Sequence, residues 1–251
     1  SIMDMYEGRE IVKTVRKISL EDLANLIIRG GWPANINVAK DKCGLMPKYY
    51  INSILEKDIY ESKNVDSVKM QKLLKSLARN ESTVVSNNKL IKDISDNDDL
   101  NIDKRTVSDY IEILEKLNLF SNQLSYSTNY RSPERVGKNV KRHFTDPSLA
   151  AALLNMNANK LIADLKTFGF LFEALVERDL KIYMDYLDGN LYHFRDNVTG
   201  LEVDSILEFS DGEYAAVEIK LGFNQFKEAC ESLLKFQDNV TKKPKFMCVI
   251  C

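Results

Sequence analysis

The segment GLEVDSILEFSDGEYAAVEIKLG (200–222) decides the fold of the C-terminal part of the chain. Its two halves, residues 201–209 and 214–221, are rich in aliphatic side chains and bounded by turn residues, which is typical of strands. Asp211 and Gly212 between them form a dipeptide that favours a tight hairpin turn. The segment therefore predicts two antiparallel strands in the sheet of an α/β module.

Four charged side chains are predicted to meet around this hairpin. Alternation places Asp204 on the face of its strand that also carries Glu202, and it places Glu218 and Lys220 on one face of the next strand. If the two registers match, Asp204, Glu218 and Lys220 converge. In the preceding helix, Glu173 lies on or beside the buried stripe, where an unpaired carboxylate would be costly.

A divalent cation shared by Glu173, Asp204 and Glu218 would remove that cost. Mg²⁺, or Mn²⁺ in its place, prefers oxygen ligands such as carboxylates. A metal held there would activate a water and stabilise the leaving oxygen of a phosphodiester, while Lys220 offsets charge on the scissile phosphate or positions the nucleophile. The alternative is a structural ion-pair network between these carboxylates and Lys220.

The flanking sequence extends the hairpin into a complete α/β module. One long helix precedes it and another helix follows it. With two further strands, these give the order helix, three strands, helix and strand, which indicates a mixed sheet. The expected elements are the helices 165–183 and 223–237 and the strands 191–195, 201–209, 214–221 and 245–250.

Upstream, apolar spacing predicts a helical region followed by a winged-helix region. Residues 19–29 and 47–60 have the apolar stripes of two helices in a small N-terminal bundle. Residues 66–144 then predict helices at 68–77, 88–94 and 103–117 and strands at 119–120 and 140–144, the order of a winged helix. The expected fold class is therefore α+β or α/β, with domains at 1–65 (helical), 66–150 (winged-helix-like) and 151–251 (an α/β module with a mixed sheet).

Composition excludes several classes of protein. Thirty-five basic and 37 acidic residues give a net charge of −2, so no global positive field indicates nucleic-acid binding. No apolar run approaches the roughly 20 residues of a membrane span, and no secretory signal begins the sequence, so we expect a cytoplasmic protein without a membrane partner. The four cysteines lack the spacing of a zinc site or a disulfide framework.

Local basic groups are the candidates for DNA contact. Lys104 and Arg105 lie at the start of the helix 103–117, where a recognition helix would meet DNA. The region 131–142 has a surplus of positive charge and is the stronger electrostatic candidate, with a solvated loop as the alternative. Its basic residues are Arg131, Arg135, Lys138, Lys141 and Arg142.

Three segments of the C-terminal part resemble a known family: FGFLFEALVERDL (168–180), FRDNVTGLEVDSILE (194–208) and AAVEIKLG (215–222). They look like the C-terminal domain, of the DUF4143 type, of prokaryotic AAA-type ATP-binding proteins. That domain is similar to the PD-(D/E)xK, or restriction-endonuclease-like, superfamily. Upstream matches extend the resemblance over most of residues 20–222, in RGGWPA (29–34), YINSILEKDI (50–59), TVSDYIEILEKL (106–117) and KRHFTDPSLAAALL (141–154).

The resemblance implies a metal role for Glu173, Asp204 and Glu218 and a catalytic role for Lys220. Relatives of this kind carry an N-terminal ATPase domain with a Gly-x-x-x-x-Gly-Lys-Ser/Thr loop, and nothing in this sequence matches that pattern. We therefore expect a C-terminal fragment whose own N-terminal ATPase domain would bind ATP. Ser205 stands where the family commonly has an apolar or aromatic residue, and it lies on the face opposite to Asp204.

Two functions from different classes remain open. The first is Mg²⁺-dependent cleavage or binding of DNA by the nuclease-like module, and retention of all four charged side chains favours it. The second is a catalytically silent scaffold that recognises DNA or a protein partner, while ATP hydrolysis in the N-terminal domain acts as a switch. Near-neutral charge favours the second, because a phosphodiesterase must hold a polyanion.

Overall fold

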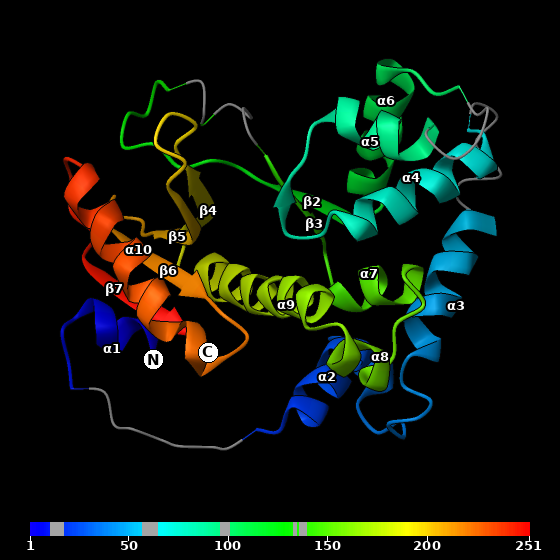
Figure 1. Ribbon diagram of the computed structural model, residues 1–251, viewed down its shortest axis with the longest axis horizontal. Coiled ribbons are helices and arrows are strands. Elements are labelled where there is room, and N and C mark those ends of the chain that lie inside the picture. Colours follow the sequence, from blue (N-terminus) through cyan, green and yellow to red (C-terminus); the bar gives the residue numbers. More distant parts are fainter. Residues whose placement is uncertain (11–17, 57–64, 96–100, 133–134, 136–139) are drawn as a thin grey trace. The chain divides into compact units, whose positions relative to one another are not determined.

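The computed structural model of the chain describes residues 1–10, 18–56, 65–95, 101–132, 135 and 140–251 (Figure 1). The described residues form a mixed α+β protein with two sheets, which confirms the coarse fold class expected from the sequence. The chain divides into two compact units. The sheet unit comprises residues 1–19, 123–138 and 176–251, and the helical unit comprises residues 20–122 and 139–175.

The sheet unit is built on four strands in the order β4-β5-β6-β7. Antiparallel pairing joins β4 to β5 and β5 to β6, whereas β6 and β7 are parallel. The parallel pair requires a crossover connection, which a helix supplies. The predicted strands are confirmed with small changes at their ends, as β4 (Asn190–Arg195), β5 (Glu202–Glu208), β6 (Tyr214–Ile219) and β7 (Phe246–Ile250).

The crossover helix α10 (Phe226–Asn239) covers one face of this sheet (Figure 1). It follows a short 3-10 helix, η4 (Phe223–Gln225). Leu233 and Phe236 of α10 are buried against Tyr214 and other side chains of the strands. Each apolar side chain buried in this way contributes about 2 kcal/mol, so the core holds β5, β6 and α10 in fixed positions.

A β-bulge interrupts β5 at the candidate site. Its pairing with β4 changes register around His193, so that this one residue faces two, Asp204 and Ser205. The strict alternation predicted for the strand therefore fails, because Val203 and Ile206 both belong to the same core cluster. Bulges re-aim local side chains and are common beside functional sites.

Two segments that are distant in the sequence complete the sheet unit. The helix α1 (Ile2–Tyr6) brings the ring of Tyr6 to a centroid distance of 4.5 Å from the ring of Phe209. Ser125 forms a parallel bridge with His193 of β4. The sheet unit is thus assembled from three stretches of the chain.

The helical unit joins a set of helices to a three-stranded sheet in the order β1-β3-β2. Its strands are β1 (Thr83–Val84), β2 (Phe120–Gln123) and β3 (Lys141–Phe144). Its helices are α2 (Leu20–Arg29), η1 (Pro33–Asn35), α3 (Leu45–Ile54), α4 (Ser67–Arg79), α5 (Asn87–Ser95), α6 (Lys104–Lys116), α7 (Pro147–Leu153) and α8 (Ala158–Ala163). The helix α9 (Leu165–Tyr186) contributes its first half to the helical unit and its second half to the sheet unit.

The predicted helices of this unit are largely confirmed. Asp103 caps α6, as the sequence predicts, by accepting the backbone N–H of Thr106 at 2.7 Å. The helix predicted at 47–60 begins earlier, as α3, and the last part of that prediction, residues 57–60, lies outside the described residues. The sequence patterns do not predict β1, α7 or α8.

The start of α7 is tied to the end of α2. Asp146 caps α7 by accepting the N–H of Ser148 at 2.9 Å, and it also accepts the N–H of Gly31 at 2.8 Å. The indole N–H of Trp32 donates to the Ser148 hydroxyl at 2.9 Å. Gly30 has a φ of 66°, and a β-carbon there would lie 2.4 Å from the same hydroxyl, so only glycine fits.

Candidate functional site

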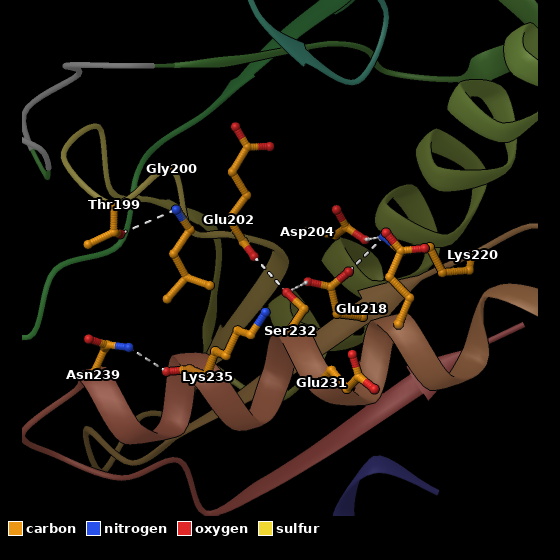
Figure 2. Close-up of a pocket in the computed structure, with 12 residues that line it drawn as sticks. Thr199, Gly200, Glu202, Asp204, Glu218, Lys220, Glu231, Ser232, Lys235 and Asn239 are labelled. Atoms are coloured by element: carbon orange, nitrogen blue, oxygen red, sulfur yellow. Dashed lines mark hydrogen bonds and ion pairs between the residues drawn. The ribbon is translucent and has the colours of Figure 1, made fainter.

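Asp204, Glu218 and Lys220 meet at one end of the β5–β6 pair (Figure 2). Ser205 pairs with Val217, which sets Asp204 opposite Glu218. The Nζ atom of Lys220 lies 3.1 Å from Asp204 Oδ2 and 2.7 Å from Glu218 Oε2. The structure therefore brings together three of the four side chains that the sequence analysis singled out.

Backbone and helix groups hold the two carboxylates in place. Asp204 Oδ2 accepts the backbone N–H of Ile219 at 2.8 Å. The Ser232 hydroxyl of α10 donates to Glu218 Oε1 at 3.3 Å, so both oxygens of that carboxylate have partners. A dashed line in Figure 2 marks the contact between Ser232 of α10 and Glu218 of β6. Such support makes the geometry of the acidic pair rigid.

Burial sets the electrostatics of the cluster. Glu218 is 3% exposed, and burial, followed by the charge of Asp204, raises its pKa to about 7 against the smaller opposing effect of Lys220. Burial lowers the pKa of Lys220, but the two carboxylates outweigh burial and the net shift is upward. Lys220 therefore stays charged, and its single ammonium serves two carboxylates.

The three side chains line an open pocket of about 500 Å³ beside α10. Its acidic lining residues are Glu202, Asp204, Glu218, Glu228 and Glu231, and its basic ones are Lys220 and Lys235. Five carboxylates against two ammonium groups leave an excess of three negative charges when all are ionised. The Glu202 side chain points away from α10 (Figure 2) and pairs with Arg195 at 2.5 Å. The pocket suits a cation better than a polyanion.

Glu173, the fourth predicted residue, lies in the helical unit and forms an ion pair with Lys141 of β3. The side chains of Glu173 and Lys141 are 14% and 7% exposed. Their ion pair therefore offsets much of the cost of burying Glu173, which the sequence analysis expected a metal to remove. Within the sheet unit, the carboxylate that α9 presents to β5 is that of Glu177. It is 3% exposed and accepts the Ser205 hydroxyl at 3.2 Å.

Three residues of the predicted basic patch have internal partners. The Arg135 guanidinium donates to Glu208 at 2.7 and 3.2 Å and lies over the rings of Tyr126, Tyr130 and Tyr192. Arg135 was predicted to belong to an exposed basic patch, and this prediction is corrected. The count of nearby charges in the sequence did not include the tyrosine rings and the carboxylate that hold its guanidinium. Arg135 therefore offers little charge to a phosphate.

Lys141 and Arg142 were also predicted to lie in an exposed basic patch, and both are buried. Lys141 forms the buried pair with Glu173, while Arg142 donates to Asn122 at 2.7 Å and to Asn87 at 2.9 Å. Burial lowers the pKa of the Arg142 guanidinium. β3 carries both residues into the interior of the helical unit, so neither contributes to an exposed basic surface.

The remaining basic candidates are Lys104, Arg105 and Arg131, which are exposed, and Lys138, which lies outside the described residues. Arg105 is 4.0 Å from Asp109, one helical turn away. Exposed ion pairs at this spacing are weak, so the charged groups of Lys104 and Arg105 remain accessible to solvent or to a ligand. Lys104 and Arg105 are only two residues, and both lie at the start of α6.

The acidic pair fits a divalent cation of the Mg²⁺ type. Mg²⁺ binds through one or two carboxylates and keeps several waters, and Asp204 and Glu218 are two carboxylates within reach of one ammonium. Burial and the charge of Asp204 raise the pKa of Glu218, and a bound cation would oppose both effects by favouring the ionised carboxylate. Among the described residues, no group of three or more His, Cys, Asp or Glu side chains is arranged to hold a metal, so waters or substrate oxygens would complete the coordination.

Sequence reasoning missed the residues that support the pair. Ser232 is a polar residue on an otherwise amphipathic helix, and its spacing from the buried Ala229 and Leu233 indicates only that it lies near the edge of the packed face. Glu177 stands four residues after Glu173, on the same side of α9, and this spacing could have identified it as an alternative inward carboxylate. The choice between them depends on long-range contacts.

The fold and this site define a mixed α+β protein whose sheet unit carries an acid-lysine cluster beside an acidic pocket. Residues 20–160 match the family model described as Domain of unknown function (DUF8612), and the chain belongs to that family. Residues 168–251 match a second model, Domain of unknown function (DUF4143), which confirms the domain resemblance found in the sequence.

Other comparisons add no relative. Neither the curated proteins nor the solved structures contain a match. No helix in the described part of the chain is long and apolar enough to cross a membrane.

Proposed function

We propose that the sheet unit is a nuclease-like module that hydrolyses phosphodiesters with a divalent cation held by Asp204 and Glu218. The observation that carries the proposal is the convergence of these two carboxylates and Lys220 in an open pocket. A bound Mg²⁺ or Mn²⁺ would supply an activated water and a Lewis acid for the leaving oxygen. DNA is the substrate that the resemblance to the PD-(D/E)xK superfamily suggests.

Each residue of the cluster has a distinct task in this proposal. Asp204 is oriented by the N–H of Ile219 and Glu218 by the Ser232 hydroxyl, so both present oxygens to the pocket without further ordering. With a cation held by the two carboxylates, the Lys220 ammonium would be free to offset the charge that develops on the scissile phosphate. The burial of Glu218 strengthens these interactions by lowering the local dielectric.

The wider assignment rests on element order and resemblance. The order α4, β1, α5, α6, β2 and β3, with a sheet β1-β3-β2, supports a winged helix in the helical unit. The resemblance supports an AAA-type parent protein whose N-terminal domain binds ATP. In that protein the winged helix would position DNA or a protein partner through α6, whose exposed start carries Lys104 and Arg105.

Titration of Mg²⁺ and Mn²⁺ into the purified chain by calorimetry tests the site. We expect binding to the wild type and loss of binding in Asp204→Ala. Glu231→Gln removes one charge from the same pocket without touching the pair and should change affinity only slightly. Lys220→Met should retain the cation and lose cleavage of single- and double-stranded DNA. Absence of cation binding in the wild type would overturn the proposal.

The same titration decides the role of Glu173. If Glu173→Gln loses as much affinity for the cation as Asp204→Ala does, this result supports Glu173 as the predicted third metal ligand. Unchanged affinity with a lower free energy of unfolding assigns Glu173 to its ion pair with Lys141 alone.

A catalytically silent scaffold is the second candidate function. The observation that favours it is the position of Lys220, which satisfies both carboxylates as an internal ion-pair network. The excess of acidic groups in the pocket points the same way, because they repel phosphates. Under this function the wild type binds no divalent cation, and Lys220→Met lowers stability because it removes the ammonium from the buried Glu218 and the partly buried Asp204.

A further inference from the structure

Two aromatic rings stand at the start of α10, directly after the candidate site in the sequence. Phe223 is 77% exposed and Phe226 is 38% exposed. Their ring centroids are 5.2 Å apart and their planes are inclined by 14°, which is a stacked arrangement. One ring thus supports the other, and Phe223 presents an open aromatic face to solvent. Single exposed apolar residues are common on proteins, but a pre-stacked pair that follows a candidate-site residue so closely in the sequence is a more specific feature.

The short sequence separation from Lys220 limits how far Phe223 can lie from the acid-lysine cluster. Phe223 is three positions after Lys220, so at full extension their α-carbons are at most about 11 Å apart. Nucleotides repeat at about 3.4 Å along each strand of a stacked duplex and are more widely spaced in an extended single strand. A phosphate at Lys220 and a base at Phe223 therefore belong to the same nucleotide or to near neighbours.

The local charges favour a single strand over a duplex. Lys227, one turn after Phe223, is almost fully exposed and lies 4.0 Å from Glu231. With Glu228 also nearby, the start of α10 has no strong positive field for the two charged strands of a duplex. Stacking on an aromatic face needs no such field, because every base has a π-face. The base of a single strand is thus the ligand that this surface suits.

We propose that Phe223, backed by Phe226, is a stacking platform for a base of single-stranded nucleic acid whose phosphate lies at Lys220. This inference rests on the proposed function, since it names the substrate class for the same site. The platform selects unpaired ends or single strands, because a base inside a duplex already stacks on its neighbours and has no free face.

Fluorescence anisotropy with a short labelled oligothymidylate tests the platform, with Ca²⁺ in place of Mg²⁺ so that cleavage does not compete. We expect Phe223→Ala to bind about tenfold more weakly than the wild type, the size of a lost base stack. Phe223→Tyr keeps a ring and should bind as the wild type does. Val198→Ala is the matched control, because Val198 is a 94% exposed apolar residue of the same unit, outside the pocket.

An oligomer with an abasic position gives the second arm. If Phe223 stacks on a base, removal of the base that it contacts weakens wild-type binding, and Phe223→Ala then causes no further loss. Equal affinity of the wild type and Phe223→Ala for the intact oligomer overturns the inference. So does a tenfold loss that persists in full with every abasic oligomer, since this would reflect a change in protein structure.

The outcomes also separate the platform from the cation site. Cation binding without any oligonucleotide binding overturns the platform and leaves the cation site in place. Ring-dependent oligonucleotide binding without any Mg²⁺ or Mn²⁺ binding supports the platform and overturns metal-dependent cleavage. If Phe223→Ala changes self-association in sedimentation but not oligonucleotide affinity, the rings form a protein contact and the inference is wrong.

Discussion

At the scale of single residues, Glu218 makes a pH-dependent contribution to stability. Burial and Asp204 raise its folded pKa to about 7 from 4.5. A carboxyl group whose folded pKa is raised stabilises the fold fully below its unfolded pKa, and this contribution is lost as pH rises through the folded pKa. Stability should therefore fall between about pH 4.5 and pH 7 because of this group.

Glu218→Gln tests this effect, because glutamine has nearly the same shape and no charge to lose. With a chelator present, we expect the unfolding free energy of the wild type to fall between pH 5 and pH 8 by about 2 kcal/mol more than that of the variant. Urea unfolding at both pH values measures the difference. Addition of Mg²⁺ should reduce the gap by stabilising only the wild type. A constant difference at the two pH values would contradict the pKa argument.

Residue patterns predicted part of this site and misplaced another part. Alternation along two strands was enough to bring Asp204, Glu218 and Lys220 together, because β5 and β6 pair in a regular register at that end. The bulge opposite His193 left no sign in the sequence, since one inserted residue does not change composition. The partner of Glu173 is Lys141, thirty-two positions away, and no local pattern shows which charges pair over that separation.

At the scale of elements, Asp146 links the cap of α7 to the end of α2. Asp146→Ala removes the acceptor for the N–H groups of Ser148 and Gly31, and we expect a loss of about 2 kcal/mol in unfolding free energy. Asp146→Asn retains an oxygen for one of these contacts and should lose less. Chemical denaturation at constant pH gives both values. Equal losses in the two variants would show that charge, rather than the capping oxygen, stabilises this junction.

Long amphipathic elements were predictable, and small buried ones were not. The helices α6, α9 and α10 have apolar residues at helical spacing, so their positions follow from the sequence. α7 has the start signals Asp146 and Pro147, but its body consists mainly of small residues that are buried together, so it lacks a polar face. β1 has only two residues, and it is a strand because β3 pairs with it.

At the scale of the whole molecule, the chain is organised in discontinuous units. The sheet unit combines three stretches of sequence and the helical unit combines two. Arg135 shows how a distant stretch joins its unit, because its guanidinium is held by Glu208 of β5 and by three tyrosine rings. Sequence patterns can divide a chain only into consecutive segments. The domains predicted at 1–65, 66–150 and 151–251 are consecutive segments, and they remain a prediction.

The distribution of charge over the molecule predicts how nucleic-acid binding responds to salt. The net charge is −2, Lys141 and Arg142 are buried, and Arg135 is paired with Glu208, so none of these three offers a free cation to displace counterions from phosphates. If Lys220 and Lys227 make the phosphate contacts, about two counterions are released from a single strand. The slope of log Kobs against log salt should then be about −1.4.

Anisotropy titrations of the labelled oligothymidylate over a range of KCl concentrations measure this slope. Lys227→Gln should make the slope shallower by about 0.7, whereas Phe223→Ala should weaken binding equally at every salt concentration, because stacking releases no counterions. A slope steeper than about −4 would require an extended basic surface. Lys104, Arg105 and Arg131, the other exposed basic candidates, would then be the first residues to replace. The salt dependence thus decides whether binding is concentrated at the sheet unit or spread over a surface that includes α6.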